Sequence, residues 1–175
     1  MSSRAFGAPV EKFDELHEAI ASYIARAAEK LRLQSSVAAA VYVFIHTNRF
    51  KEAEPQYGAG VTVALIDPSD DTLRLIAAAR EGLEAIYREG YRYKKAGVML
   101  TMLSEKDARQ RCLFDNTAST EKSSRLMRVL DAVNAEFGRD TLRSAASGRH
   151  QRWAMRSEMR SPRYTTRWDE LPVAS

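Results

Sequence analysis

Carboxylates are the side chains whose spacing could most directly do chemistry, and the closest group is Asp67, Asp70 and Asp71. Three acids so near one another could bind a cation. They also stand just before a predicted helix, where aspartates form turns and accept hydrogen bonds from the first helical N–H groups. We expect turn and cap chemistry here. The other clustered acids are placed along a predicted helix: Glu11, Asp14, Glu15 and Glu18.

The three histidines and the single cysteine do not predict a metal centre. His17, His46 and His150 are far apart in the sequence and Cys112 is alone, so a zinc site lacks ligands and a disulfide lacks a partner. No candidate nucleophile has a base beside it. We interpret the histidines as structural or solvated residues and expect no cofactor in this chain.

A basic group stands in the segment GYRYKKAGVMLTML, which has the pattern of a β-strand. Because alternate strand residues point to opposite faces, we expect Arg92 and Lys94 to share one face and Lys95 to take the other. These cations could contact the phosphates of a nucleic acid. They could also keep an edge strand soluble. Arg4 and Arg49, near the ends of other strands, are weaker candidates for the same role.

Composition predicts an ordinary soluble protein. The chain has 175 residues, of which 45% are hydrophobic and 29% charged. Its longest apolar run, from Val37 to Ile45, is too short to cross a bilayer, and no export signal opens the sequence. We therefore expect a cytoplasmic protein without a membrane partner. The net charge of +4 favours a polyanionic partner only weakly.

The first 103 residues predict an α+β fold. Apolar spacings of three and four indicate two helices, one from Phe13 to Leu31 with Pro9 in its first turn, and one from Leu75 to Ile86 ended by Gly90. Runs of β-branched and aromatic residues predict strands at 37–47, 61–66 and 90–103, and residues 2–7 could be an edge strand or a tail. This order predicts a four-stranded antiparallel sheet with both helices on one face and the other face free for a ligand.

The remaining residues predict a linker and a small helical extension. No periodicity survives over residues 104–122, and then a helix with Ser123 or Ser124 as its cap runs to Gly138. Residues 141–148 could form one short strand. The final third interleaves arginines with Trp153, Tyr164 and Trp168, which could stack on bases. These aromatic residues could also fold back on the protein, and we favour this for Trp153.

A set of motifs carries a family resemblance: SRAFG, YIARAAEKLR, FIHTNRF, YRYKKAGVMLTML, LMRVLDAVNAEFGRDTL and SPRYTTRWDELP. In this order they resemble the C-terminal part of the UmuC-type, error-prone translesion DNA polymerases of the Y family. The resemblance implies a DNA-binding little finger domain at 1–103, a linker at 104–122 and a C-terminal extension at 123–175. It also implies that the catalytic core, with its Mg²⁺ ions, is absent, so this chain alone should not polymerise DNA.

The resemblance implies several partners. In the family, the little finger strands contact phosphates of primed or damaged DNA through backbone amides and basic side chains. The peptide QRCLF is similar to a sliding-clamp-binding motif through Gln110, Leu113 and Phe114, although Arg111 replaces a leucine. The Leu-Phe pair could instead pack on its own domain. For the extension, the family suggests docking to the processed UmuD dimer or to a RecA filament.

A different class of protein remains an alternative: a free-standing, ferredoxin-like module that binds nucleic acid or serves as a small-molecule regulatory domain, although the latter would not explain the basic strand. RNA-recognition motifs share this order of elements, and YGAGVTV distantly resembles their aromatic strand signature. Those modules stack bases on aromatic side chains of central strands. Here the corresponding residues are Gly58, Gly60, Val61 and Thr62, so the sequence disfavours RNA binding.

Overall fold

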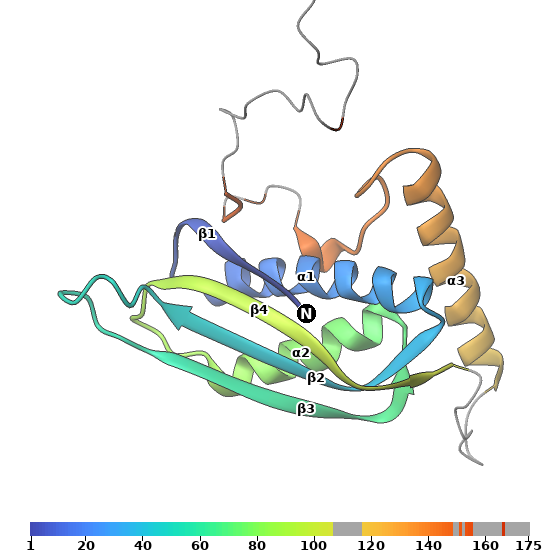
Figure 1. The fold of residues 1–175 in the computed structure, drawn as a ribbon, viewed down its shortest axis with the longest axis horizontal. Coiled ribbons are helices and arrows are strands. Elements are labelled where there is room, and N and C mark those ends of the chain that lie inside the picture. Colours follow the sequence, from blue (N-terminus) through green and yellow to red (C-terminus); the bar gives the residue numbers. More distant parts are fainter. Residues whose placement is uncertain (107–116, 149–150, 152, 156–165, 167–175) are drawn as a thin grey trace, which may run out of the picture.

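The computed structural model describes residues 1–106, 117–148, 151, 153–155 and 166. Four strands and two long helices make up the first part of the chain, and a third helix and a short 3-10 turn follow (Figure 1). Their bounds are β1 Ser2–Val10, α1 Phe13–Leu33, β2 Ser36–Thr47, β3 Gly58–Ser69, α2 Thr72–Ile86, β4 Tyr93–Glu105, α3 Thr117–Glu136 and η1 Ala145–Ser147.

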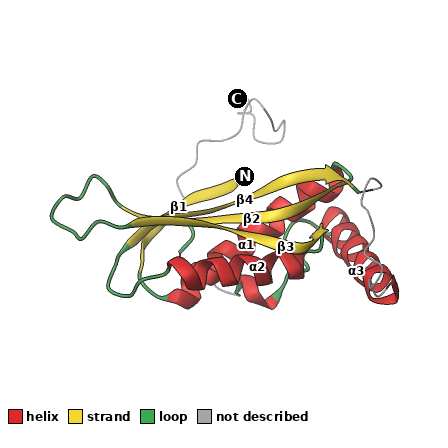
Figure 2. Cartoon of the chain, turned by 90° about the horizontal axis from the view of Figure 1, so that it is seen from below, coloured by secondary structure: helices red, strands yellow, loops and turns green. Residues whose placement is uncertain are grey.

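The strands form one antiparallel sheet in the order β1-β4-β2-β3. Both α1 and α2 lie on the same side of this sheet (Figure 2). The predicted α+β fold is therefore confirmed, and residues 2–7 belong to an edge strand rather than to a tail. Among the described residues, no helix is both long and apolar enough to span a bilayer.

The hydrophobic core lies between the sheet and the two helices. Alternate residues of β2, namely Val41, Val43 and Ile45, point into it because strand side chains alternate between faces. One stripe of each amphipathic helix packs against them. The largest fully buried side chains include Tyr93, Phe6, Leu16, Ile20, Ile24, Leu75 and Leu83.

Two details next to the predicted helix starts were wrong, namely the place of Pro9 and the end of the strand expected at 61–66. Pro9 lies in β1 and not in the first turn of α1, a place that suits proline because an outer strand can lack one N–H donor. Before α2, β3 continues to Ser69, so the helix cap is Asp71, whose Oδ1 accepts hydrogen bonds from Leu73 N at 2.7 Å and Arg74 N at 3.3 Å. The predicted cap chemistry is thus confirmed for Asp71.

Two predictions for the C-terminal part also need correction. The third helix does not begin at Ser123 or Ser124 but at Thr117, because extending a packed helix adds one hydrogen bond per ordered residue at little cost. Residues 141–148 contain no strand. They include η1, where the Ser144 hydroxyl accepts a hydrogen bond from Ala146 N, so a local turn replaces the expected ladder.

α3 is anchored to the sheet domain by a small number of specific contacts. Arg32, whose side chain is 9% exposed, donates from Nε and Nη2 to the Asp131 carboxylate at 2.6 and 2.7 Å. The same guanidinium donates to Asp70 O at 2.7 Å and to Thr72 Oγ1 at 2.9 Å. Met127 of α3 is 2% exposed beside Thr72. These contacts hold the helix against α1 and the start of α2.

Candidate nucleic-acid interface

The sheet face opposite α1 and α2 is the candidate interface, and we call it the open face. Strand register places alternate residues of all four strands on it. Glu105, at the end of β4, continues this alternation, so the acid-free part of the face is its centre. The residues of this central part make it compatible with a polyanion. They are Ser3, Ala5, Tyr42, Phe44, His46, Gly58, Gly60, Thr62, Lys95, Gly97, Met99 and Thr101.

Three aromatic rings follow one another along β2 on the open face. The ring centroids of Tyr42 and Phe44 lie 5.9 Å apart with 30° between the ring planes, and those of Phe44 and His46 lie 5.4 Å apart. The Lys95 ammonium sits 5.9 Å from the Phe44 centroid. Phe44 is only 8% exposed, so it serves as a floor for the face more than as a free stacking platform.

Glycines on the neighbouring strands leave room for these rings. A Cβ atom added to any of three glycines would collide with an aromatic side chain of β2, so the rings lie across positions that have no side chain of their own. This arrangement produces low relief, and strand glycines are typical where another backbone approaches closely. The pairs are Gly58 with His46, Gly60 with Tyr42 and Gly97 with Phe44.

The aromatic row changes one argument drawn from the sequence. Stacking rings were expected to be missing because Gly58 and Gly60 occupy the positions compared with RNA-recognition motifs. The structure places aromatic rings on β2, which is a central strand, at Tyr42, Phe44 and His46. That reason for disfavouring RNA binding was therefore wrong, since it compared the wrong strand.

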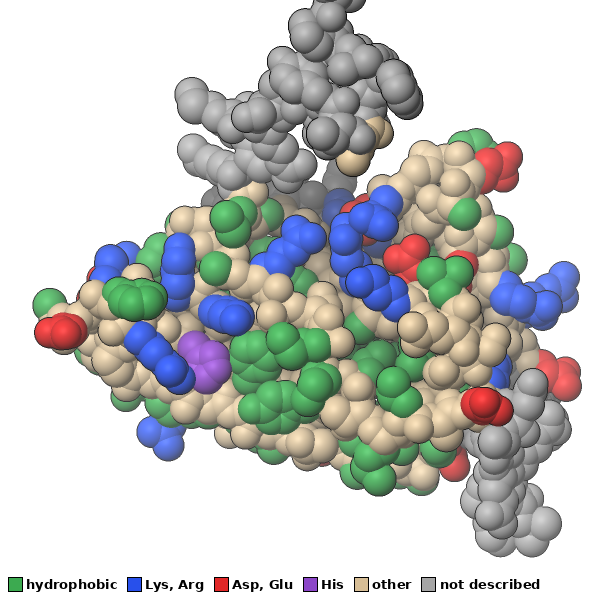
Figure 3. Space-filling view, in the orientation of Figure 1, with side chains coloured by type: hydrophobic (Ala, Val, Ile, Leu, Met, Phe, Trp, Pro, Cys, Tyr) green, Lys and Arg blue, Asp and Glu red, His purple; other side chains and the backbone are tan. Residues whose placement is uncertain are grey.

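Two of the predicted DNA-binding cations lie together at the open face. Lys95 is on β4, and Arg49 follows β2 in the connecting loop. Burial lowers the pKa of His46 below its ordinary value, and the charges of Arg49 and Lys95 lower it further. Both cations therefore act on one histidine. Figure 3 looks onto this side of the molecule, where Lys and Arg side chains gather toward β1 and β4.

A β-bulge redirects the third predicted cation. Between Tyr93 and Lys95 the pairing with β2 shifts, so Lys94 is an extra residue in β4. Its Nζ donates to Phe6 O of β1 at 2.6 Å. The expected common face for Arg92 and Lys94 was wrong, because Arg92 precedes the strand and the bulge interrupts the alternation after it.

The remaining two candidates lie away from Lys95. Arg92 forms ion pairs with Glu11 at 3.2 Å and Glu54 at 3.0 Å, although its side chain stays 48% exposed. Arg4 pairs with Ala96 in the β1–β4 ladder and so projects to the side of the sheet that carries the helices. The structure therefore brings together Lys95 and Arg49 and separates Arg4, Arg92 and Lys94 from them.

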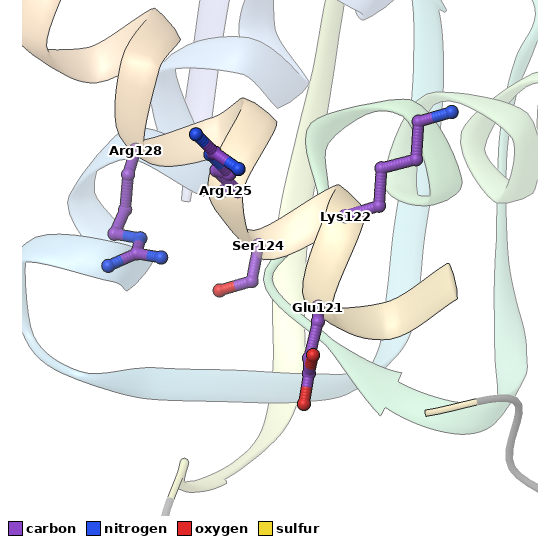
Figure 4. A pocket seen from close by; sticks show the side chains of 5 residues that line it. All are labelled: Glu121, Lys122, Ser124, Arg125 and Arg128. Carbon is purple, nitrogen blue, oxygen red and sulfur yellow. The ribbon is translucent and has the colours of Figure 1, made fainter. Parts of the chain in front are cut away.

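A second basic cluster, which the sequence analysis did not single out, lies on the first half of α3. Lys122, Arg125 and Arg128 line a hollow of about 470 Å³ together with Glu121 and Ser124. Figure 4 shows Arg125 and Arg128 on the same side of the helix as Ser124, with Lys122 pointing away. The helical spacing of Arg125 and Arg128 was the available signal.

The acidic cluster has structural partners. Asp70 forms an ion pair with Lys106 at 2.6 Å, and Asp71 Oδ2 accepts a hydrogen bond from Ser123 in addition to capping α2. Within the part of the chain that the structure describes, no group of three or more His, Cys, Asp or Glu is placed to hold a metal ion.

Of the other predicted site residues, the structure describes Trp153 but not the clamp-binding residues. Gln110, Leu113 and Phe114 lie outside the described residues, so clamp binding stays a prediction. Trp153 is described, and the interpretation that it folds back on the protein is confirmed, since it is 6% exposed among the rings of the core.

The charge around His46 leads to a pH prediction. Because folding lowers its pKa from 6.5, His46 makes the fold less stable as pH falls from 6.5 through the lowered value. Replacing Arg49 and Lys95 by alanine should raise this pKa toward, but not to, 6.5, since burial persists. NMR titration measures it. The pKa of His17, which burial and Arg80 lower, should not move. If the pKa of His46 were the same in this double variant as in the parent chain, the placement of the two cations beside it would be wrong.

Two family models match the chain. The impB/mucB/samB family C-terminal domain matches residues 1–113, which includes the whole sheet domain. A domain of unknown function matches residues 124–174, which includes most of α3 and all of η1.

Curated relatives match almost the whole chain. Protein UmuC of Salmonella typhimurium is 44% identical over 169 residues, which are 97% of this chain and 40% of that protein. Protein SamB of the same organism is 38% identical over 172 residues, and Protein MucB of Escherichia coli is 39% identical over 173, each covering 40% of the relative. The chain thus spans about 40% of the length of these relatives. It belongs to the impB/mucB/samB family and is homologous to the C-terminal region of UmuC, SamB and MucB.

Proposed function

We propose that this chain is the non-catalytic C-terminal region of an error-prone translesion DNA polymerase, and that its open face grips primed or damaged DNA. The observation that carries the proposal is the low relief of the centre of this face, whose strand residues include no acid there, with Lys95 on it and Arg49 close enough to act on His46. Under this proposal, polymerase chemistry and its Mg²⁺ belong to a catalytic core outside these 175 residues.

The chemistry of the open face suits phosphate contact more than base readout. Arginine usually makes bidentate hydrogen bonds to guanine, and asparagine or glutamine makes them to adenine. None of these three residue types occurs among the strand residues of the open face. The glycines at positions 58, 60 and 97 leave little relief around the rings, which lets a phosphate backbone approach the strands closely, and Lys95 and Arg49 supply positive charge. Contacts of this kind fix register without reading sequence, which a polymerase on damaged template requires.

A double substitution tests this proposal. Lys95→Ala with Arg49→Ala should weaken binding to primed duplex DNA and make it less sensitive to salt, because two phosphate contacts are lost. If the chain neutralises about four phosphates, the slope of log affinity against log salt should change from roughly −3.6 to roughly −1.8. Fluorescence anisotropy over a salt series measures both quantities.

A matched control removes the same charge from the helix layer. Arg74→Ala with Arg80→Ala on α2 should leave affinity and salt slope close to those of the parent chain, since α2 lies on the other side of the sheet (Figure 2). Equal losses in both double variants would show that net charge, and not the open face, governs binding.

We further infer that residues 107–116 tether the polymerase to its sliding clamp through Gln110, Leu113 and Phe114. Support comes from the similarity of this peptide to clamp-binding motifs, and the contacts on either side of it show where it leaves and rejoins the domain. Before it, Lys106 is paired with Asp70, and after it, within α3, Ser123 contacts the neighbouring Asp71. The described residues on either side of the segment are thus held near the start of α2.

The second candidate is a module that binds single-stranded nucleic acid outside a polymerase. The aromatic row of Tyr42, Phe44 and His46 favours it. Tyr42→Ala separates the two: a large loss of binding to single-stranded RNA would support the module, because base stacking depends on rings. Preserved binding to primed duplex would support the polymerase region. Docking of the extension to a UmuD dimer or a RecA filament remains a proposal.

A further inference from the structure

A segment of the C-terminal extension lies against the first strand of the sheet domain. We call the described residues between Ser144 and Met155 the strap; they include η1, Gln151 and Trp153. Its most direct link is a backbone hydrogen bond in which Gly7 N of β1 donates to Trp153 O at 3.1 Å. β1 is an outer strand of the sheet, so the strap reaches an edge that the other strands leave uncovered.

Trp153 is the side chain that holds the strap. It is 6% exposed and packs edge-to-face against Phe6 of β1, at 6.2 Å and 74°, and against Tyr23 of α1, at 5.7 Å and 82°. Edge-to-face contacts of this kind are favourable for aromatic pairs. Burial raises the pKa of Tyr23 to about 12, in keeping with a hydroxyl enclosed at this contact.

A second set of contacts fixes the strap to α1. Gln151 Nε2 donates to Ser22 Oγ at 3.0 Å, and η1 packs along the same helix. Two glycines allow the close approach. A Cβ at Gly7 would come within 2.8 Å of Ala154 O, and one at Gly148, whose φ is +65°, would collide with the Glu18 carboxylate.

The strap meets β1 where the pairing of this strand with β4 is irregular. The register with β4 breaks between Ala5 and Val10, so the residues between them fall outside the regular ladder. Unpaired N–H groups on an outer strand invite pairing with another chain. Pro9 has no N–H, and the amide of Gly7 is taken by the strap.

We propose that the strap occupies the outer edge of β1 at Gly7 within the same chain and so hinders strand addition there by a second copy of this chain. This assigns an intramolecular role to part of a region that matches a domain of unknown function. It does not depend on DNA or clamp binding.

Hydrogen exchange in the full chain tests the strap. The amide of Gly7 should be protected in the parent chain, and Trp153→Ala should lower that protection at least tenfold while amides of β2 stay protected. The variant should also self-associate at concentrations where the parent chain does not, measured by sedimentation velocity. Met155→Ala, which removes an exposed side chain of the same segment, is the matched control and should change neither readout.

A milder variant keeps the test decisive if Trp153→Ala does not fold. Gln151→Ala removes only the bond to Ser22 and should lower Gly7 protection by a smaller factor. In a Trp168→Phe background, Trp153 is the one remaining tryptophan, and its emission should be that of a buried indole. Solvent-exposed emission, or a Gly7 amide that exchanges as fast as an unstructured peptide in the parent chain, would overturn the proposal.

Discussion

Replacing Gly97 by valine is expected to destabilise the folded chain by about 1–3 kcal/mol, the usual cost of overpacking a filled site. A Cβ atom at Gly97 would lie 2.5 Å from the Phe44 ring and would also collide with the Cβ of Ser3. Both neighbours are fixed by the strands on either side of β4, so the ring must leave its place across the sheet. Urea denaturation, read as a lower midpoint at unchanged slope, measures the loss.

The same substitution should also weaken DNA binding, because a displaced Phe44 ring raises the relief of the open face. Binding is compared at a temperature where both chains are folded. Thr62→Val, an exposed change of similar shape on β3, serves as the control and should stay within about 0.5 kcal/mol. A Gly97→Val chain as stable as its parent would contradict the packing of the aromatic row.

Replacing Leu113 and Phe114 together by alanine is expected to abolish retention on the sliding clamp while leaving the melting temperature nearly unchanged. Burying the two side chains in a partner pocket would contribute roughly 3–6 kcal/mol before the cost of ordering the peptide. Losing that contribution should make binding undetectable. Co-elution with the clamp on primed DNA measures retention, and a thermal melt measures stability.

Arg111→Leu is the informative companion variant. It restores the leucine that the family motif carries at this position, so clamp affinity should rise while thermal stability stays the same. If the double alanine variant instead melts at a clearly lower temperature, Leu113 and Phe114 pack on their own domain, and the proposed tether is wrong.

Periodicity predicted most of the fold because it reports local geometry. Helical spacing from Phe13 to Leu31 and the apolar run at 37–47 each correspond to an observed element. The local pattern was less informative where the bounds or type of an element depend on packing against another part of the chain. Thus α3 begins before its expected cap at Ser123, whose hydroxyl contacts Asp71, and the expected strand at 141–148 contains a 3-10 turn.

By itself, the sequence determined the fold class, the family resemblance and the segments that carry charge. Only the tertiary structure decided which charges share a surface. Arg92 is held by Glu11 and Glu54, whereas a bulge turns Lys94 toward β1. The orientation of these side chains depends on strand register and on ion pairs between residues tens of positions apart. Neither can be recognised from the spacing of residues within one segment.

The same reasoning explains the aromatic row and the strap. Each β2 ring lies across a glycine of a neighbouring strand, a relation that becomes visible only when the strands are paired. Trp153 was predicted to fold back, but its place between Phe6 and Tyr23 required the folded chain. Side-chain type is local information, whereas the partner of a side chain is set by contacts between distant parts of the sequence.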